Sequence, residues 1–243
     1  MTNVLEHSFE FYKKNIELIF LFSIAFILAF IIPVFAPLPT YNDAGGIFIR
    51  TASVFANLNI YSASIIVVSV FFSLLFLSFA IVAINILVRH TRTHTKIRDE
   101  VIKGIERYTG RVFFILIIYT GILLLVNILF YSYGISGIAT SLVGIALMPL
   151  FFYAPSAIVI DEHKLRPAIR AGMRFFIKKP SYVLLWVAVA ILGITIFDFI
   201  FITITGTVIS RYLMLIFNGF ILLPFLVVLQ SQMYMKRFPL LKH

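Results

Sequence analysis

The sequence has no cysteine and little charge. Without cysteine there can be no disulfide framework, thiolate metal ligand or cysteine nucleophile. Charged residues make up 12% of the 243 positions, about half of the roughly 25% that a soluble domain carries. The hydrophobic share is 61% and the mean hydropathy is +1.05. This shortage of charge and excess of apolar residues predict an integral membrane protein.

Sequence motifs of common catalytic sites are also missing. The chain contains no G-x-S-x-G elbow, no Walker A loop and no dinucleotide fingerprint. His90 and His94 are four residues apart, but Thr-Arg-Thr separates them and no third ligand is evident, so a solvated basic loop is favoured over a metal site. We therefore expect a non-enzymatic protein that needs no metal or cofactor.

Long apolar runs define the predicted architecture. About 20 mostly apolar residues are needed to cross roughly 30 Å of hydrocarbon. Six stretches of a single domain, 1–243, satisfy this requirement: about 16–36, 60–88, 112–133, 137–160, 182–204 and 209–232. The connections YSYG and TITGT are so short that the spans beside them must form hairpins. The predicted fold is an all-α polytopic membrane protein with six transmembrane helices arranged as three hairpins.

Amphipathic stretches precede the first, third and fifth spans. Apolar residues recur at helical spacing in 5–16, 101–112 and 165–176, which predicts a cytoplasmic interfacial helix before each hairpin. Between the first two spans, 37–59 begins with PLPTYNDAGG and continues as IFIRTASVFANLN. The second part of that connection is predicted to form a short helix on the outer surface.

The distribution of Lys and Arg predicts the orientation. Eighteen of the twenty lie at the two termini or in the second and fourth connections, and Arg50 and Arg211 lie on the other side. Because positive charge accumulates on the cytoplasmic side, both termini are expected in the cytoplasm, with the protein in the plasma membrane. The net charge of +10 is thereby explained without nucleic-acid binding.

The few polar residues inside the predicted spans form the first candidate site. They are Asn85, Tyr119, Asn127, Tyr153, Asp198, Arg211, Asn218 and Gln230. Polar groups at membrane depth usually face a cavity or the protein interior, although hydrogen bonds between helices can serve packing alone. Asp198 and Arg211 flank the TITGT turn at similar depths and are predicted to form an ion pair. The alternative is that each reaches the outer headgroups separately.

A basic stripe forms the second candidate site. Arg166, Arg170, Arg174 and Lys178 recur every four residues beside an apolar face of Leu165, Ile169, Met173 and Phe176. Such a helix is predicted to lie at the membrane surface with its aliphatic side in lipid and its cations among anionic headgroups. The stripe would bind lipid headgroups or a protein partner, or would only anchor the topology.

The segment APSAIVIDEHKLRPAIRAGMRFFIKKP at 154–180 carries a family resemblance. A proline-containing span there ends in an acidic pair and leads into a helix rich in alanine and arginine. With the amphipathic lead-in before a span, this pattern resembles the prokaryotic six-span membrane proteins related to YciC and the membrane domain beside some glycerophosphodiester phosphodiesterases. The resemblance implies membrane residence and brings no catalytic residues.

These observations lead to one function and two alternatives. We expect a protein that handles or organises a lipid or another hydrophobic substrate, or that serves as a transport component. Its expected partners are membrane lipids and a further membrane protein. The alternative is a permease subunit driven by a separate ATPase chain, which would dock on helices 99–109 and 165–178. An intramembrane enzyme is a distant third, and substrate and oligomeric state stay open.

Overall fold

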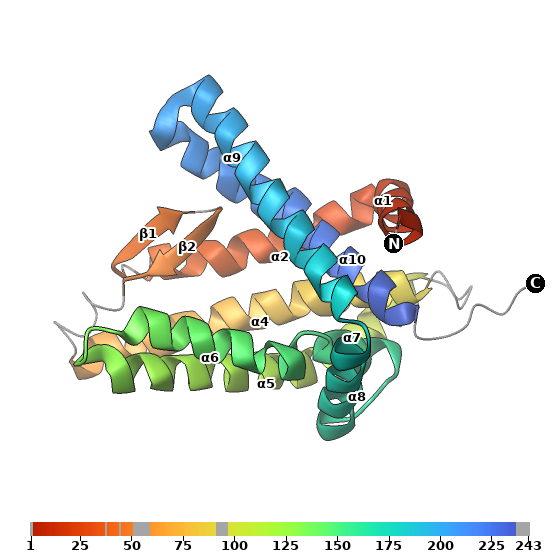
Figure 1. Cartoon of the computed structure of the whole chain (residues 1–243), viewed down its shortest axis with the longest axis horizontal. Coiled ribbons are helices and arrows are strands. Elements are labelled where there is room, and N and C mark those ends of the chain that lie inside the picture. Colours follow the sequence, from red (N-terminus) through yellow and green to blue (C-terminus); the bar gives the residue numbers. More distant parts are fainter. Residues whose placement is uncertain (1, 37, 44, 51–58, 91–96, 237–243) are drawn as a thin grey trace, which may run out of the picture.

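The computed structural model describes residues 2–36, 38–43, 45–50, 59–90 and 97–236 (Figure 1). Helices dominate this part of the chain. In order, the elements are α1 (Thr2–Lys14), α2 (Ile16–Phe35), β1 (Thr40–Asp43), β2 (Gly46–Ile49), α4 (Ile60–His90), α5 (Ile97–Tyr131), α6 (Ser136–Phe151), α7 (Ala154–Ile160), α8 (Leu165–Lys178), α9 (Pro180–Phe217), the π-helical η1 (Asn218–Leu222) and α10 (Leu223–Met235).

Five helical segments of the described chain are long and apolar enough to cross a membrane. They are Ile16–Phe35, Ile60–His90, Val101–Tyr131, Ser136–Ile160 and Pro180–Met235.

The last of these segments contains two antiparallel legs. It has 56 residues, which would extend about 84 Å as one straight helix, far beyond the roughly 30 Å of hydrocarbon. Gly206 has a φ of 76° and interrupts the helix, and the chain reverses its direction there (Figure 1). The rings of Phe197 and Phe217 stack with centroids 4.0 Å apart across the two legs.

The predicted fourth span, 137–160, is two helices rather than one. α6 ends at Phe151 and α7 begins at Ala154. Pro155 lies in the first turn of α7, where its missing N–H removes a bond to the preceding turn. The break places the Tyr153 side chain in the core, with no exposed surface.

The described chain is almost entirely helical, as predicted, but a short β-hairpin stands where the predicted outer-surface helix begins. β1 pairs antiparallel with β2, with Thr40 opposite Ile49 and Tyr41 opposite Phe48. The sequence NDAGG supplies turn residues, and Gly45 adopts a φ of 72°, which glycine tolerates without strain. The rest of the predicted surface helix, 51–58, lies outside the described residues.

Only two of the three predicted lead-in helices are separate. α1 ends before Asn15, and α8 ends before Pro180 starts α9. The second lead-in, however, is part of α5, which is continuous from Ile97 to Tyr131. Its sequence contains no proline, and single glycines such as Gly104 and Gly110 are too weak to end a helix.

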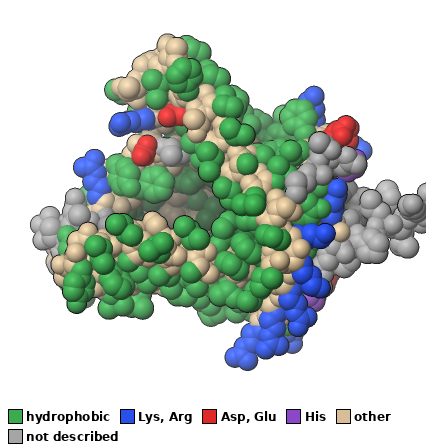
Figure 2. Space-filling model, viewed as in Figure 1, with side chains coloured by type: hydrophobic (Ala, Val, Ile, Leu, Met, Phe, Trp, Pro, Cys, Tyr) green, Lys and Arg blue, Asp and Glu red, His purple; other side chains and the backbone are tan. Residues whose placement is uncertain are grey.

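The molecule has two chemically different ends. The hairpin end carries β1, β2 and the reversal at Gly206, while the basic end carries α1, α7, α8 and the end of α10 (Figure 1). Figure 2 shows Lys and Arg side chains gathered at the basic end over α8. The larger of the two buried hydrophobic clusters includes Tyr153, Ile158 and Tyr234, which are fully buried at this end.

Candidate functional site

The predicted intramembrane polar residues are distributed over several separate places. Asp198 and Arg211 line a small polar cavity of about 130 Å³ together with Asp43 and Gly45 of the β-hairpin. In the described structure no nitrogen–oxygen distance of 4.0 Å or less joins Asp198 to Arg211, so the predicted direct ion pair does not form. Arg211 is exposed, and Asn42 donates a hydrogen bond to its backbone carbonyl at 3.3 Å.

Buried asparagines connect elements that are distant in sequence. The Asn218 side-chain amide donates to the Gly45 carbonyl at 2.8 Å and holds the β-hairpin against η1. Asn85 on α4 accepts a hydrogen bond from the Ser231 hydroxyl on α10 at 2.7 Å. Both asparagines are buried. Their bonds support the interpretation that they stabilise packing between helices.

Of the four remaining predicted polar residues, Gln230 on α10 donates to the Phe152 carbonyl between α6 and α7 at 2.5 Å. The other three also contact neighbouring helices. Tyr119 packs against Phe151 with ring centroids 5.4 Å apart. Asn127 donates to Thr140 at 3.4 Å. The Tyr153 hydroxyl contacts the Met233 sulfur at 3.9 Å. These three residues therefore belong to helix–helix contacts and do not share a cavity with Asp198.

The basic stripe lies on α8 as predicted, but most of the predicted apolar face packs against protein, and only Met173 of that face is exposed. The buried residues of α8 are Ala168, Ala171, Gly172 and Phe175, and the helix packs on α6 and α7. Leu165, Ile169 and Phe176 also pack against the core, because small side chains let α8 approach the backbone of α7 closely. The cations of the stripe, Arg166, Arg170, Arg174 and Lys178, are exposed.

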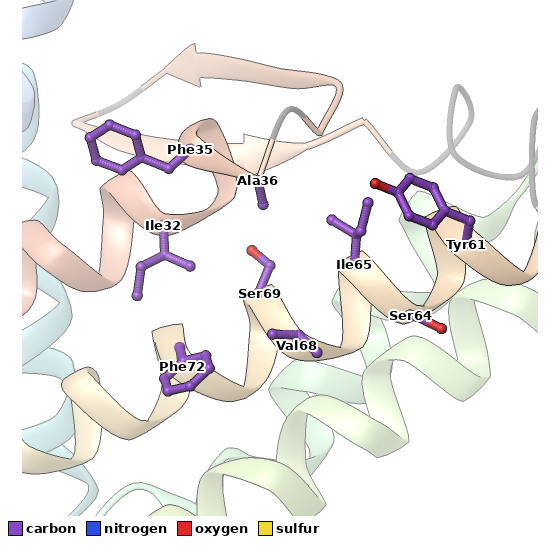
Figure 3. Close-up of a pocket in the computed structure, with 9 residues that line it drawn as sticks. All are labelled: Ile32, Phe35, Ala36, Tyr61, Ser64, Ile65, Val68, Ser69 and Phe72. Atoms are coloured by element: carbon purple, nitrogen blue, oxygen red, sulfur yellow. The ribbon is translucent and has the colours of Figure 1, made fainter.

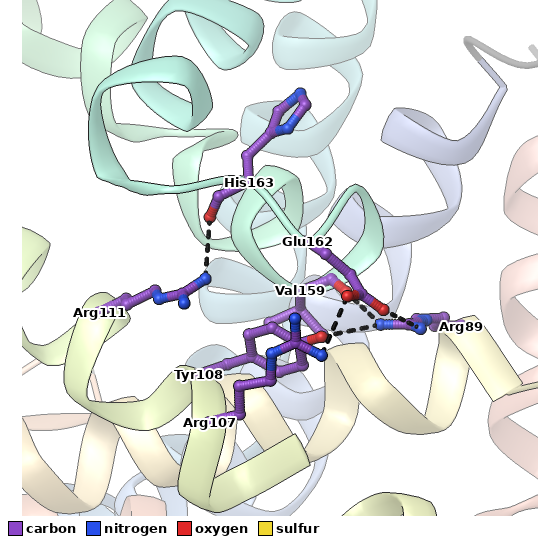
Figure 4. Close-up of polar contacts among 7 residues, drawn as sticks. All are labelled: Arg89, Arg107, Tyr108, Arg111, Val159, Glu162 and His163. Carbon is purple, nitrogen blue, oxygen red and sulfur yellow. Dashed lines mark hydrogen bonds and ion pairs between the residues drawn. The ribbon is translucent and has the colours of Figure 1, made fainter.

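An ionic network at the basic end was not predicted from the sequence (Figure 4). Arg89 at the end of α4 and Arg107 on α5 both bind Glu162, at 2.6 and 3.1 Å. Arg89 also donates to the Val159 carbonyl at 3.0 Å and to the Tyr108 hydroxyl at 3.3 Å. The hydrogen bond from Arg89 holds the pKa of Glu162 below its ordinary value. The network joins α4 and α5 to the loop after α7.

The neighbours of Glu162 extend this network to other elements. The Tyr234 hydroxyl of α10 donates to the Asp161 carboxylate at 2.5 Å. Arg111 of α5 donates to the His163 carbonyl at 3.4 Å. The acidic pair after a proline-containing span was visible in the sequence, but its partners come from three other helices. Pairwise contacts of that kind have no local sequence signal.

An apolar cavity of about 420 Å³, open to the surface, lies between α2 and α4 near the hairpin end (Figure 3). Its lining residues are Ile32, Phe35, Ala36, Tyr61, Ser64, Ile65, Val68, Ser69 and Phe72. Ser69 is 2% exposed, and its hydroxyl has no hydrogen-bond partner. In Figure 3 this hydroxyl points from α4 into the space facing α2. We call this space the α2–α4 cavity.

A second apolar cavity lies farther toward the basic end. It measures about 400 Å³, and its lining residues are Leu21, Ile24, Ala25, Leu28, Leu75, Phe76, Phe79 and Thr109. The Thr109 hydroxyl also has no partner. Both cavities fall within the range of about 300–1,000 Å³ that small-molecule sites occupy.

Comparison with known proteins found no matching family model, no similar curated protein and no similar solved structure. Within the described ranges, no three His, Asp or Glu side chains group closely enough to hold a metal ion. His94, half of the histidine pair considered above, lies outside those ranges. The apolar cavities and the network at the basic end are thus the features from which a function can be inferred.

Proposed function

We propose that the chain is a non-enzymatic plasma-membrane protein that holds a lipid or another hydrophobic molecule between its helices. The observation that carries this proposal is the α2–α4 cavity. It is almost entirely apolar, yet Ser69 in its lining has a buried hydroxyl without a partner.

Six spans with both termini in the cytoplasm are part of this proposal. Five helical segments suit a membrane, and the reversal at Gly206 divides the last into two legs, which supports the proposal of six crossings. Eighteen of the twenty Lys and Arg residues belong to the segments expected inside, in keeping with the positive-inside rule. The clustering of cations at the basic end supports the same orientation (Figure 2).

The surface around the α2–α4 cavity supports lateral entry from the bilayer. Val67 and Val68 are 68% and 54% exposed, and Phe71 and Phe72 are also exposed. A hydrocarbon chain that slides along this face of α4 therefore meets no polar group that would have to be desolvated. Inside the cavity, the chain would restore the dispersion contacts that an empty space lacks.

The permease alternative has weaker support. One of its two predicted docking helices, 99–109, is an internal part of α5. The other, α8, packs on α6 and α7 through one side, which leaves only its exposed side, including the cations, for a partner. An ATPase chain that co-purifies in stoichiometric amount would favour the permease.

Lipid retention after mild detergent extraction tests the proposal. The wild-type protein should keep about one lipid per chain, measured by native mass spectrometry. Ala36→Trp should lower this occupancy, because Ala36 lines the α2–α4 cavity and an indole would fill its mouth. Ala188→Trp on the exposed side of α9 is the matched control and should retain the lipid. A wild-type protein that retains and rebinds no lipid would refute the proposal.

A further inference from the structure

The Ser69 hydroxyl differs from the hydroxyls of Ser64 and Ser78 on the same helix. The Ser73 hydroxyl of α4 is also buried without a partner, but of these two serines only Ser69 lines the α2–α4 cavity. Serine in a helix commonly donates to the carbonyl four residues earlier. Ser64 does so to Ile60 at 2.8 Å, and Ser78 does so to Leu74 at 2.6 Å. Ser69 is buried in the same helix without any such bond. Since an unpaired buried hydroxyl is costly, this position suits an acceptor that comes from outside the chain.

The depth of Ser69 indicates which acceptor that is. Tyr61 is 75% exposed at the cavity mouth, where aromatic side chains of membrane proteins mark the headgroup layer. Ser69 is eight residues farther along α4, about 12 Å at 1.5 Å per residue. The headgroup layer is about 5–8 Å thick on each side. Ser69 therefore lies about one helical turn inside the hydrocarbon border, close to the depth of the ester carbonyls of a glycerolipid.

A cation lies at the same end of the cavity. Arg50 directly follows β2, and its N–H donates to the Pro39 carbonyl at 2.7 Å, which ties it to the chain just after α2. The hairpin passes over the end of α2 above the cavity (Figure 3). Arg50 is exposed and makes no ion pair within the described ranges. Its guanidinium complements a phosphate in charge and geometry.

We propose that the α2–α4 cavity binds one acyl chain of a glycerophospholipid, whose ester carbonyl accepts a hydrogen bond from Ser69 while its phosphate lies toward Arg50. This inference rests on the function proposed above and names the ligand class. A helix from a second copy of the chain is a poorer occupant. Its backbone carbonyls are already hydrogen-bonded, and it brings no anion to Arg50.

Paired lipids that differ only in their linkage test the role of Ser69. Diester and diether phosphatidylglycerol of equal chain length carry the same headgroup, but only the diester has the carbonyls. The purified full-length protein should bind the diester more tightly by roughly two- to tenfold, the range of one net hydrogen bond. Ser69→Ala should abolish this preference and leave binding of the diether unchanged.

Two further variants make the test specific. Ser64→Ala is the matched control, because Ser64 lines the same cavity while its hydroxyl is already bonded to Ile60; it should keep the diester preference. Arg50→Gln should weaken binding of both lipids equally and preserve that preference. Both predictions are read from affinities measured by native mass spectrometry.

The outcomes separate this inference from the function beneath it. If the wild-type protein binds both lipids equally and Ser69→Ala changes nothing, the inference is wrong while lipid holding stands. If the wild-type protein binds neither lipid, both fail. If delipidated protein forms dimers that Ala36→Trp dissociates, a second copy occupies the cavity and the inference is overturned.

Discussion

The ionic network around Glu162 allows a stability prediction to be worked out in detail. Glu162→Gln keeps the size of the side chain but removes its charge from both arginines. The Arg89 side chain is 21% exposed, that of Glu162 is 37% exposed and that of Arg107 is 57% exposed. The contact between Arg89 and Glu162 should therefore stabilise the fold more than a surface ion pair does, and the contact with Arg107 should not. Together they should contribute about 1–2 kcal/mol to the free energy of unfolding. For a chain of this length that corresponds to about 2–8 °C in Tm.

Thermal unfolding in detergent at pH 7 measures this effect, with Glu106→Gln as the control. Glu106 is exposed on the same helix as Arg107 and does not take part in the network described above, so its variant should match the wild type within about 1 °C on the same scaling. If Glu162→Gln unfolded at the wild-type temperature, the network would not stabilise the junction of α4, α5 and α7.

The difference in stability between the wild type and Glu162→Gln should depend on pH in a defined direction. Arg89 holds the pKa of Glu162 below its ordinary value of 4.5. A carboxylate with a lowered pKa contributes stability above the ordinary value and loses it as the pH falls through the lowered one. The gap between wild type and Glu162→Gln should therefore be constant from pH 6 to 8 and close below about pH 4.5. A gap that persisted at lower pH would show that the amide itself disturbs the loop.

Two further predictions concern orientation and packing. Because the chain has no cysteine, single introduced cysteines report which side of the membrane they lie on. Thr207→Cys should react with an impermeant thiol reagent on intact cells, and Lys178→Cys should not. The reverse pattern would show that the orientation is inverted. Gly172→Ala should lower Tm in detergent, because the added Cβ would lie 3.1 Å from the Ala154 nitrogen, an overpacking cost of about 1–3 kcal/mol. Gly121→Ala has open space and should be neutral or stabilising; equal effects of the two would contradict the close packing of α8.

The positions of the long helices were largely predictable from the sequence, because they depend on apolar composition and periodicity. The apolar runs 16–36 and 60–88 correspond closely to α2 and α4, because each run is long and the one proline in them, Pro33, lies in the last turn of α2. The fourth run contains Pro149 and Pro155, and the structure breaks between them. The lead-in at 101–112 has helical periodicity, but periodicity does not show whether one helix ends before the next begins. In the structure, the lead-in continues into the span without a break.

The candidate site was less predictable because it depends on which helices are neighbours. The sequence marks Asp198 and Arg211 as unusual, and the structure places both at one cavity without a direct ion pair. Ser69 carried no signal, because a serine in an apolar run looks the same whether its hydroxyl is bonded, like that of Ser78, or unpaired. The contact between Arg89 and Glu162 joins residues 73 positions apart.

Photo-crosslinking in native membranes tests the central claim most directly. A glycerophospholipid with a diazirine in its acyl chain would be activated in cells that express the protein, and the modified peptides would be mapped by mass spectrometry. Labels should concentrate on the residues that line the α2–α4 cavity, from Ile32 to Ala36 and from Tyr61 to Phe72. The internal control is the exposed face of α6, where Ile138 and Leu142 are 67% and 63% exposed. Equal labelling of the two places would contradict the existence of a lipid site between α2 and α4.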